Sequence, residues 1–536
     1  MAKKFQSLGV MIDMSRNAVM SLPSLKRYLP LLKKMGYNTV FLYTEDTYEV
    51  NDEPYFGYMR GRYSKDEMKE LDAFASSIGI EVIPCIQTLA HLNAIFRWGC
   101  FPRDCDDILL CDDERTYQLI DRMFATLSEC FATRRIHVGM DEAHMLGRGK
   151  FLDLHGYEPS HSIIKRHLEK VCEIGAKYGY NLMVWSDMFF RSWCDGKYYI
   201  PDVREFPEEV KNSIPESVIP VYWDYYHSTE AQYDVMFENH KQISKQVWFA
   251  GGVWCWGGFM PHNEISMRRM LPAIRSCRKN GVKNIFMTMW GDDGAECSRF
   301  AMLPSLFYVD EYAKGNEDDA AIKAKFERLV GISFDDFIKL DCPNNLLPEG
   351  KNALVNPCKN MLYSDYFNDF LDYTVVEGAS ATYAKYAEEL NAIAKKSRKY
   401  GYLFTTAARL CEALKYKYEL GLKTRRAYEA HDLDTLRTLA EVDYKQAEKT
   451  IRAFHAAFEK QWNYENKPCG FDMQDIRLGA IIQRTISCRK RILDYVNGKI
   501  DSIQELDEPL LQYGEKGQPV YLNWARGYLS TNVLSH

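Results

Sequence analysis

Residues 1–312 alternate short, almost continuously apolar runs with longer stretches of helical periodicity. Apolar runs of this kind are typical of strands that are buried on both faces, as in a parallel sheet covered by helices. The sequence predicts strands at Leu8–Asp13, Asn38–Tyr43, Ile80–Ile86, Arg135–Gly139, Asn181–Trp185, Val218–Trp223, Val247–Gly252 and Lys283–Trp290. This alternation restricts the chain to the α/β class.

Helical stretches between these runs place apolar residues on one face, for example Leu25, Leu29 and Leu32. Eight strand–helix units in 312 residues fit a (β/α)8 TIM barrel better than an open sheet. An open, doubly wound sheet would more often carry a glycine-rich phosphate-binding loop after its first strand. The sequence at that position is MSRNAVM, so we predict a barrel over residues 1–312.

The pattern changes after residue 312, where strand-like runs disappear. Leu403, Ala407, Leu410, Leu414 and Tyr418 form an apolar stripe with the spacing of a helix. We interpret such stripes as contacts between packed helices. Residues 313–536 are therefore predicted to form an α-helical C-terminal domain.

Charge and cysteine content limit the partners and the compartment. A net charge of −6 and a pI near 6.1 disfavour nucleic acid and anionic membranes as partners. The N-terminus has no apolar run typical of a signal peptide, and no stretch is long enough to span a membrane. The 15 cysteines are scattered, without a CxxC pair, which indicates reduced thiols and a cytoplasmic protein.

The stretch RRIHVGMDEAHMLGRGK, residues 134–150, is the strongest candidate for a functional site. An apolar run ends at Gly139 and is followed by the adjacent acids Asp141 and Glu142. In a barrel, residues at the carboxyl ends of strands form the active site. Tryptophans follow or end four other predicted strands, at Trp185, Trp223, Trp254, Trp256 and Trp290. We interpret this set as a wall that binds a sugar.

The pattern His-x-Gly-x-Asp-Glu after a fourth strand resembles the signature of glycoside hydrolase family 20, the β-N-acetylhexosaminidases. In that family the acetamido group of the substrate supplies the nucleophile. The resemblance implies that Glu142 protonates the leaving group and that Asp141 holds the amide N–H. Many members carry a small α+β domain before the barrel; the form without it is expected here, because the first predicted strand begins at Leu8.

The resemblance extends to other strand ends. It implies that Arg16 binds hydroxyls of the terminal sugar, and that His91 and an acid after the second strand form a relay to Glu142. Glu45 is preferred for this acid, although Asp46 stays open, since the family more often has Asp-Asp. Tyr225, with Tyr226 as the alternative, would bind the amide oxygen. Trp290 and Asp292 match the Trp-x-acid pattern of the last strand, where the family commonly has Glu.

We therefore predict an exo-acting hydrolase of glycans that end in a β-linked N-acetylhexosamine. No cofactor or metal is expected, and the sequence does not define the oligomeric state. One alternative is a metal-dependent barrel hydrolase, using His137, Asp141, Glu142 and His144. Such enzymes normally have His-x-His after the first strand, where this chain has Met14-Ser15-Arg16. A second alternative is a glycan-binding protein that has lost catalysis, but both acids are present.

Overall fold

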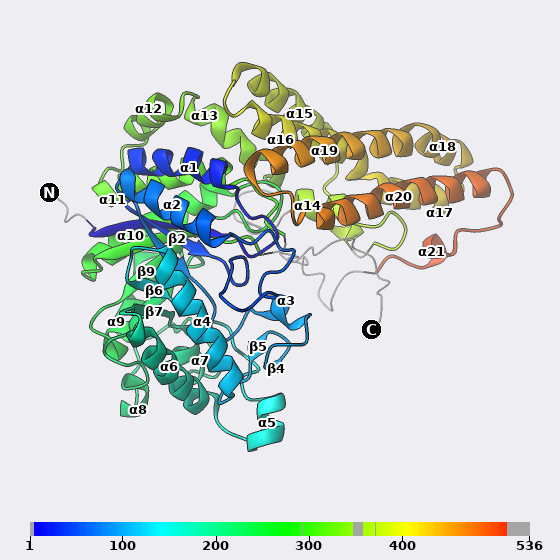
Figure 1. Cartoon of the computed structure of the whole chain (residues 1–536). Helices are drawn as coiled ribbons and strands as arrows, with labels where there is room; N and C mark the ends of the chain where they lie inside the picture. The colour runs from blue at the N-terminus through cyan, green and yellow to red at the C-terminus, as the bar shows by residue number, and fades with distance from the viewer. Residues whose placement is uncertain (1–4, 293, 347–356, 370, 512–536) are drawn as a thin grey trace. The chain divides into compact units, whose positions relative to one another are not determined.

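The computed structural model describes residues 5–292, 294–346, 357–369 and 371–511. Eight parallel strands close into a barrel in the order β1-β10-β9-β8-β7-β6-β3-β2. Helices lie on the outside of these strands (Figure 1). Their bounds are β1 Ser7–Asp13, β2 Thr39–Tyr43, β3 Glu81–Cys85, β6 Arg135–His137, β7 Asn181–Trp185, β8 Ile219–Trp223, β9 Trp248–Gly252 and β10 Asn284–Met289. All eight predicted strands are confirmed, and so is the α/β barrel.

Helices connect successive strands and cover the barrel. They include α1 Leu22–Met35, α2 Lys65–Ser77, α4 Glu114–Cys130, α6 Ser160–Lys177, α7 Asp187–Arg191, α9 Glu230–Ile243, α10 Asn263–Lys279 and α11 Leu303–Lys314. Helix α1 shows how the sequence defines an element: the Ser21 hydroxyl caps its first turn by accepting from Ser24 N, and Gly36 ends it. Its predicted apolar face is buried against the barrel.

One structural feature of the barrel was not predicted. Two short antiparallel strands, β4 Arg103–Cys105 and β5 Ile108–Leu109, form a hairpin in the long segment between β3 and α4. Helix α3, Asn93–Phe96, precedes the hairpin. Strands this short carry no apolar periodicity, so the sequence gives no signal for them.

The C-terminal part of the chain is helical, as predicted. Its helices are α12 Asp319–Val330, α13 Phe334–Phe337, α14 Pro357–Tyr363, α15 Ala379–Lys396, α16 Gly401–Lys417, α17 Leu420–Glu429, α18 Leu433–Thr438, α19 Tyr444–Glu465, α20 Phe471–Val496 and α21 Gln504–Asp507. The predicted stripe along α16 is fully buried, in a helical layer in which α16 packs against α15 and α19. The unassigned segment Tyr513–His536 lies outside the described residues.

The chain divides into two compact units, and the division does not follow a single point in the sequence. The barrel unit comprises residues 1–253, 264–290 and 305–325, and the helical unit comprises residues 254–263, 291–304 and 326–536. The boundary predicted after residue 312 falls inside α11. Within the helical unit, buried Glu296 accepts from Lys359 Nζ at 2.8 Å and from Arg477 Nη1 at 2.7 Å, which ties segment 291–304 to helices α14 and α20.

Candidate active site

The segment after β6 carries the two adjacent acids in a turn of unusual backbone geometry. Gly139, Met140 and Glu142 have φ values of 76°, 72° and 51°. A side chain at residue 139 would place its Cβ only 2.1 Å from Gln87 Oε1, so this position requires glycine. Positive φ is unfavourable for Met140 and Glu142, and such strain persists where the surrounding structure enforces it, often at functional sites.

Asp141 is the inner of the two acids, with 11% of its side chain exposed. Its Oδ1 accepts a hydrogen bond from Gln87 Nε2 at 2.7 Å, and its Oδ2 lies 3.4 Å from His91 Nε2. Burial would raise the pKa of Asp141, but the charge of His91 and the hydrogen bonds from His91 and Gln87 lower it. The Asp141 carboxylate is therefore ionised at neutral pH.

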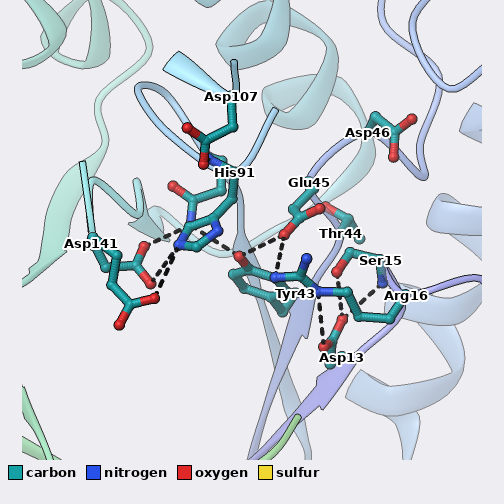
Figure 2. A network of polar contacts seen from close by, with 12 residues as sticks. Asp13, Ser15, Arg16, Tyr43, Thr44, Glu45, Asp46, His91, Asp107 and Asp141 are labelled. Carbon is teal, nitrogen blue, oxygen red and sulfur yellow. Dashed lines mark hydrogen bonds and ion pairs between the residues drawn. The ribbon is translucent and has the colours of Figure 1, made fainter. Parts of the chain in front are cut away.

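His91 carries the opposite charge. Burial alone would lower the pKa of His91, but the charge and hydrogen bond of Asp141 outweigh that effect and raise this pKa to about 9. His91 Nε2 also lies 3.9 Å from Glu142 Oε2, so one imidazolium faces both acids. Its backbone N–H donates to Asp107 Oδ2 (Figure 2). Its φ of 58° is also positive, in the loop after β3.

Gln87 connects these groups, and it was absent from the predicted site. Its Nε2 lies within hydrogen-bond distance of both Asp141 Oδ1 and Tyr43 OH, at 2.7 and 2.9 Å, while its Oε1 accepts from Met140 N at 3.1 Å. One buried amide therefore fixes both the side chain of Asp141 and the strained turn that carries it. The only sequence signal for this role is the position of Gln87 directly after the third predicted strand.

Glu142 is the outer acid, with 42% of its side chain exposed. Its backbone N–H donates to Asp187 Oδ2 at 3.1 Å, and its Oε1 lies 3.9 Å from Arg191 Nη2. Asp187 also accepts from Arg191 Nε at 3.3 Å and from the indole N–H of Trp223 at 3.5 Å. Burial, followed by the charge of Asp141, raises the pKa of Asp187 to about 7. Asp187 and Arg191 are thus further site residues that the prediction did not include.

Arg16 and Glu45 form the second half of the polar network (Figure 2). Arg16 Nη2 lies 3.1 Å from Glu45 Oε1, and Tyr43 OH donates to the same oxygen at 3.0 Å. Burial raises the pKa of Glu45, and the charges of Arg16 and His91 oppose this shift. The structure therefore brings Arg16, Glu45, His91 and the two acids into one connected group.

The neighbouring acid Asp46 has a different partner. Arg60 Nε lies 3.2 Å from Asp46 Oδ2, and the same guanidinium donates to Ser15 O and Asn17 Oδ1. Arg60 therefore links the loop after β2 to the loop after β1. The contacts of Asp46 are thus those of a loop anchor, whereas Glu45 points into the network with Arg16.

Trp185, Trp223 and Trp290, the predicted tryptophans of the barrel unit, are all buried. Trp185 contacts His137 and Trp290, with ring centroids 4.2 and 6.0 Å apart, and Trp290 lies edge-on to Tyr43. Burial lowers the pKa of His137 to about 3, so this imidazole is neutral. Trp185 therefore belongs to the packed interior of the barrel, beneath the polar network.

Tyr225 stacks on Trp223 with centroids 5.5 Å apart and is buried, whereas Tyr226 is 41% exposed. The two tyrosine candidates therefore differ in burial. Trp254 and Asp292 follow β9 and β10 in the chain but belong to the helical unit. There Trp254 stacks on Trp256 at 4.3 Å, and Asp292 has a φ of 20°.

Within the described ranges, no three His, Cys, Asp or Glu side chains are grouped so that they could hold a metal ion. Of the two histidines considered as metal ligands, His137 accepts a hydrogen bond from Gly139 N through Nδ1. His144 is not among the residues of the polar network described above. None of the described helices combines the length and apolar character that a membrane crossing needs.

Comparisons with known proteins identify the family of the chain. Residues 5–243 match the family model of the glycosyl hydrolase family 20 catalytic domain, and residues 335–522 match that of the glycoside hydrolase 20C C-terminal domain. Hexosaminidase D of Homo sapiens is 24% identical over 359 residues, which cover 61% of this chain and 70% of that protein. Hexosaminidase D of Bos taurus is 27% identical over 223 residues, 38% of this chain and 58% of that protein.

A similar solved structure is the GH20 exo beta-N-acetylglucosaminidase from Vibrio harveyi, in complex with N-acetylglucosamine. It shares 15% sequence identity and a TM-score of 0.47, over 61% of this chain and 58% of that chain. The chain thus spans less than two thirds of the length of the bovine and Vibrio proteins.

The barrel, the acid pair after β6 and the two family models define a class of carbohydrate-cleaving enzymes. The chain belongs to glycoside hydrolase family 20, and it is a glycoside hydrolase of the β-N-acetylhexosaminidase type. The resemblance carried by His-x-Gly-x-Asp-Glu is thereby confirmed at the level of the family.

Proposed function

We propose that the chain is an exo-acting enzyme that removes terminal, non-reducing β-linked GlcNAc or GalNAc by a retaining mechanism in which the substrate's own amide is the nucleophile. The observation that carries this proposal is the different environment of two adjacent acids. Asp141 is buried, ionised and fixed by Gln87 and His91, whereas Glu142 is half-exposed. Adjacent acids cannot easily flank a sugar from opposite sides, as a pair with a protein nucleophile must.

In the first step the amide oxygen attacks the anomeric carbon, and the bond to the leaving oxygen breaks. The electron pair of that bond goes to the leaving oxygen, which takes the proton of Glu142. Asp141 accepts the amide N–H and stabilises the positive charge of the oxazolinium ion that forms. Tyr225 donates to the amide oxygen and aims it.

In the second step water attacks the anomeric carbon from the side that the leaving group vacated. Its proton goes to the carboxylate of Glu142, and the bond to the amide oxygen breaks. Two inversions give net retention. Holding the amide oxygen at attack distance replaces a bimolecular encounter, which can contribute on the order of 7–11 kcal/mol.

The remaining predicted residues hold the sugar. Arg16 binds its hydroxyls and is held in place by Glu45, whose Oε1 also accepts from Tyr43 OH. Trp223 and Trp290 of the barrel unit form the apolar wall, and Trp185 supports it. Trp254 and Asp292 are proposed to bind sugar on the strength of the sequence resemblance alone. His91 and Glu45 form the relay beside the acids. A cytoplasmic location is part of the proposal and is supported by the fifteen free thiols.

The test replaces acetyl hydrogens of an aryl N-acetylglucosaminide by fluorine, which weakens the amide oxygen as a nucleophile with little change in size. The turnover rate should fall steadily from acetyl to mono-, di- and trifluoroacetyl, with configuration retained. Asp141→Asn should flatten or worsen this series, because the amide loses its charged partner. A rate that ignores fluorination, or an inverted product, would overturn the mechanism.

A further inference from the structure

Three exposed aromatic side chains meet on the surface of the barrel unit. Tyr55, Tyr58 and Trp98 are 49%, 41% and 39% exposed. The ring centroid of Trp98 lies 5.6 Å from that of Tyr55 and 5.3 Å from that of Tyr58. We call these three residues the aromatic platform. Clustered aromatic rings are seldom left in water, because each one can bury a large apolar area.

The three rings of the aromatic platform are not needed to form the local hydrophobic core. Tyr48, Phe56 and Phe101, from the same two loops, are buried, and the ring centroid of Phe56 lies 5.2 Å from that of Tyr48 and 6.4 Å from that of Phe101. These residues already supply the local core. The exposed rings therefore have faces available for a ligand.

The loop that carries Trp98 begins and ends beside His91. Leu92 N donates to Asp107 O at 3.0 Å, and His91 N donates to Asp107 Oδ2 at 3.3 Å. Asp107 and His91 lie next to each other in Figure 2. Trp98 thus lies in a segment whose two ends are fixed at the polar network.

The same segment is bonded to the loop that follows Glu142. Asp104 accepts from the backbone N–H groups of Gly147, Gly149 and Phe151 at 2.7, 3.2 and 2.8 Å. The Cys105 thiol also donates to Met145 O at 3.0 Å. The Trp98 segment is therefore on the side of the outer acid.

Tyr55 and Tyr58 belong to the loop after β2, which carries Glu45. This loop is held by Arg60, which pairs with Asp46 and donates to Ser15 O in the loop that carries Arg16. Both parts of the platform are thus rigidly connected to segments that hold proposed site residues.

We propose that the aromatic platform of Tyr55, Tyr58 and Trp98 binds the sugar residues on the reducing-end side of the cleaved bond. This inference rests on the proposed function, in which Glu142 faces the leaving group. Glu142 is the exposed acid, so the leaving sugars extend towards solvent, past the loops that Asp104 holds together. The apolar C–H face of a pyranose packs on an aromatic ring, and tyrosine hydroxyls add hydrogen bonds to sugar hydroxyls. The platform therefore selects extended glycans over short ones.

The experiment compares kcat/KM for a 4-nitrophenyl N-acetylglucosaminide with kcat/KM for oligosaccharides of two to five sugars that carry a terminal β-GlcNAc. In Trp98→Ala the ratio of oligosaccharide to aryl-glycoside values should fall about five- to tenfold, and Trp98→Phe should recover most of the loss. Tyr55→Ala should act in the same direction. Tyr464→Ala is the matched control, since Tyr464 is 50% exposed on α19 of the helical unit.

An unchanged ratio in Trp98→Ala and Tyr55→Ala would overturn the proposal. A change in oligomeric state of Trp98→Ala at the same ratio would overturn it too, because the rings would then bind a second copy of the chain. Calorimetric binding of the pentasaccharide to Glu142→Gln, with and without Trp98→Ala, separates the platform from the catalytic proposal. Loss of binding in the double variant supports the platform even if the wild-type protein hydrolyses none of these substrates.

Discussion

The ion pair of His91 with Asp141 makes a quantitative prediction about stability and pH. Raising the pKa of His91 from its usual 6.5 to about 9 corresponds to about 3 kcal/mol of stabilisation, at 1.36 kcal/mol per pH unit. Only 17% of the His91 side chain is exposed, so screening by solvent reduces this figure little. We expect His91→Gln to lose about this free energy of unfolding at pH 6.

The pH dependence has a defined sign. Below pH 6.5 the imidazole is protonated in both the folded and the unfolded chain, and the full stabilisation is present. Between pH 6.5 and about 9 only the folded chain holds the proton, so the contribution declines as pH rises. The difference between wild type and His91→Gln should therefore be largest near pH 6 and smallest above about pH 9.

Urea unfolding of the barrel unit, followed by loss of activity and by tryptophan fluorescence, measures this difference at pH 6, 7.5, 9 and 10. His167→Gln is the control. Burial lowers the pKa of His167 to about 4, so this histidine is neutral throughout the range from pH 7 to 10 and its substitution should have a constant effect there. Asp141→Asn should remove the same pH dependence as His91→Gln. A difference for His91→Gln that is the same at pH 6 and pH 10 would refute the charged pair.

Three further outcomes follow from the site. Glu142→Gln should lose most of its kcat/KM on a poor leaving group and much less on an activated aryl one, because only the poor leaving group needs a proton; equal losses would exclude the acid role. Arg16→Ala should lower kcat/KM roughly 10- to 100-fold, since a hydrogen bond from a charged donor contributes about 1.5–3 kcal/mol; an unchanged value would show that Arg16 does not bind the sugar. Activity should survive dialysis against EDTA, and inactivation that added zinc reverses would favour a metal-dependent hydrolase.

The barrel could be predicted because its strands are buried on both faces. A strand such as Val247–Gly252 has no polar side to interrupt its apolar run, so the run itself marks the element. The polar network was only partly predictable. Acids that closely follow a predicted strand, such as Asp141 and Glu142, can be predicted from that position alone.

The residues that hold these acids gave weaker signals. Tyr43 looks like the last residue of a strand, and Gln87 is a neutral amide, yet they are hydrogen-bonded to each other and Gln87 contacts Asp141 directly. Likewise, Arg60 pairs with Asp46, fourteen positions earlier in the same loop. The first partners are brought together by the pairing of β2 with β3 and of β3 with β6, and the last pair by the path of the loop after β2. No local periodicity marks these residues, so only the structure identifies them.

The geometry also explains how one dipeptide can perform two chemical tasks. Consecutive residues of a regular strand would point Asp141 and Glu142 to opposite faces of the sheet. The positive φ of Met140 and of Glu142 breaks that alternation, so that both carboxylates face His91 while only one is buried. The inner carboxylate is held by two side-chain donors and stays charged, as a partner for an amide N–H must. The outer one is tied through its backbone N–H to Asp187, and its carboxyl oxygens lie 3.9 Å from Arg191 Nη2 and from His91 Nε2, in a half-exposed position where they can meet a leaving group. Gly139 and Gln87 enforce the turn, so the separation of the two roles depends on these non-catalytic residues as much as on the acids themselves.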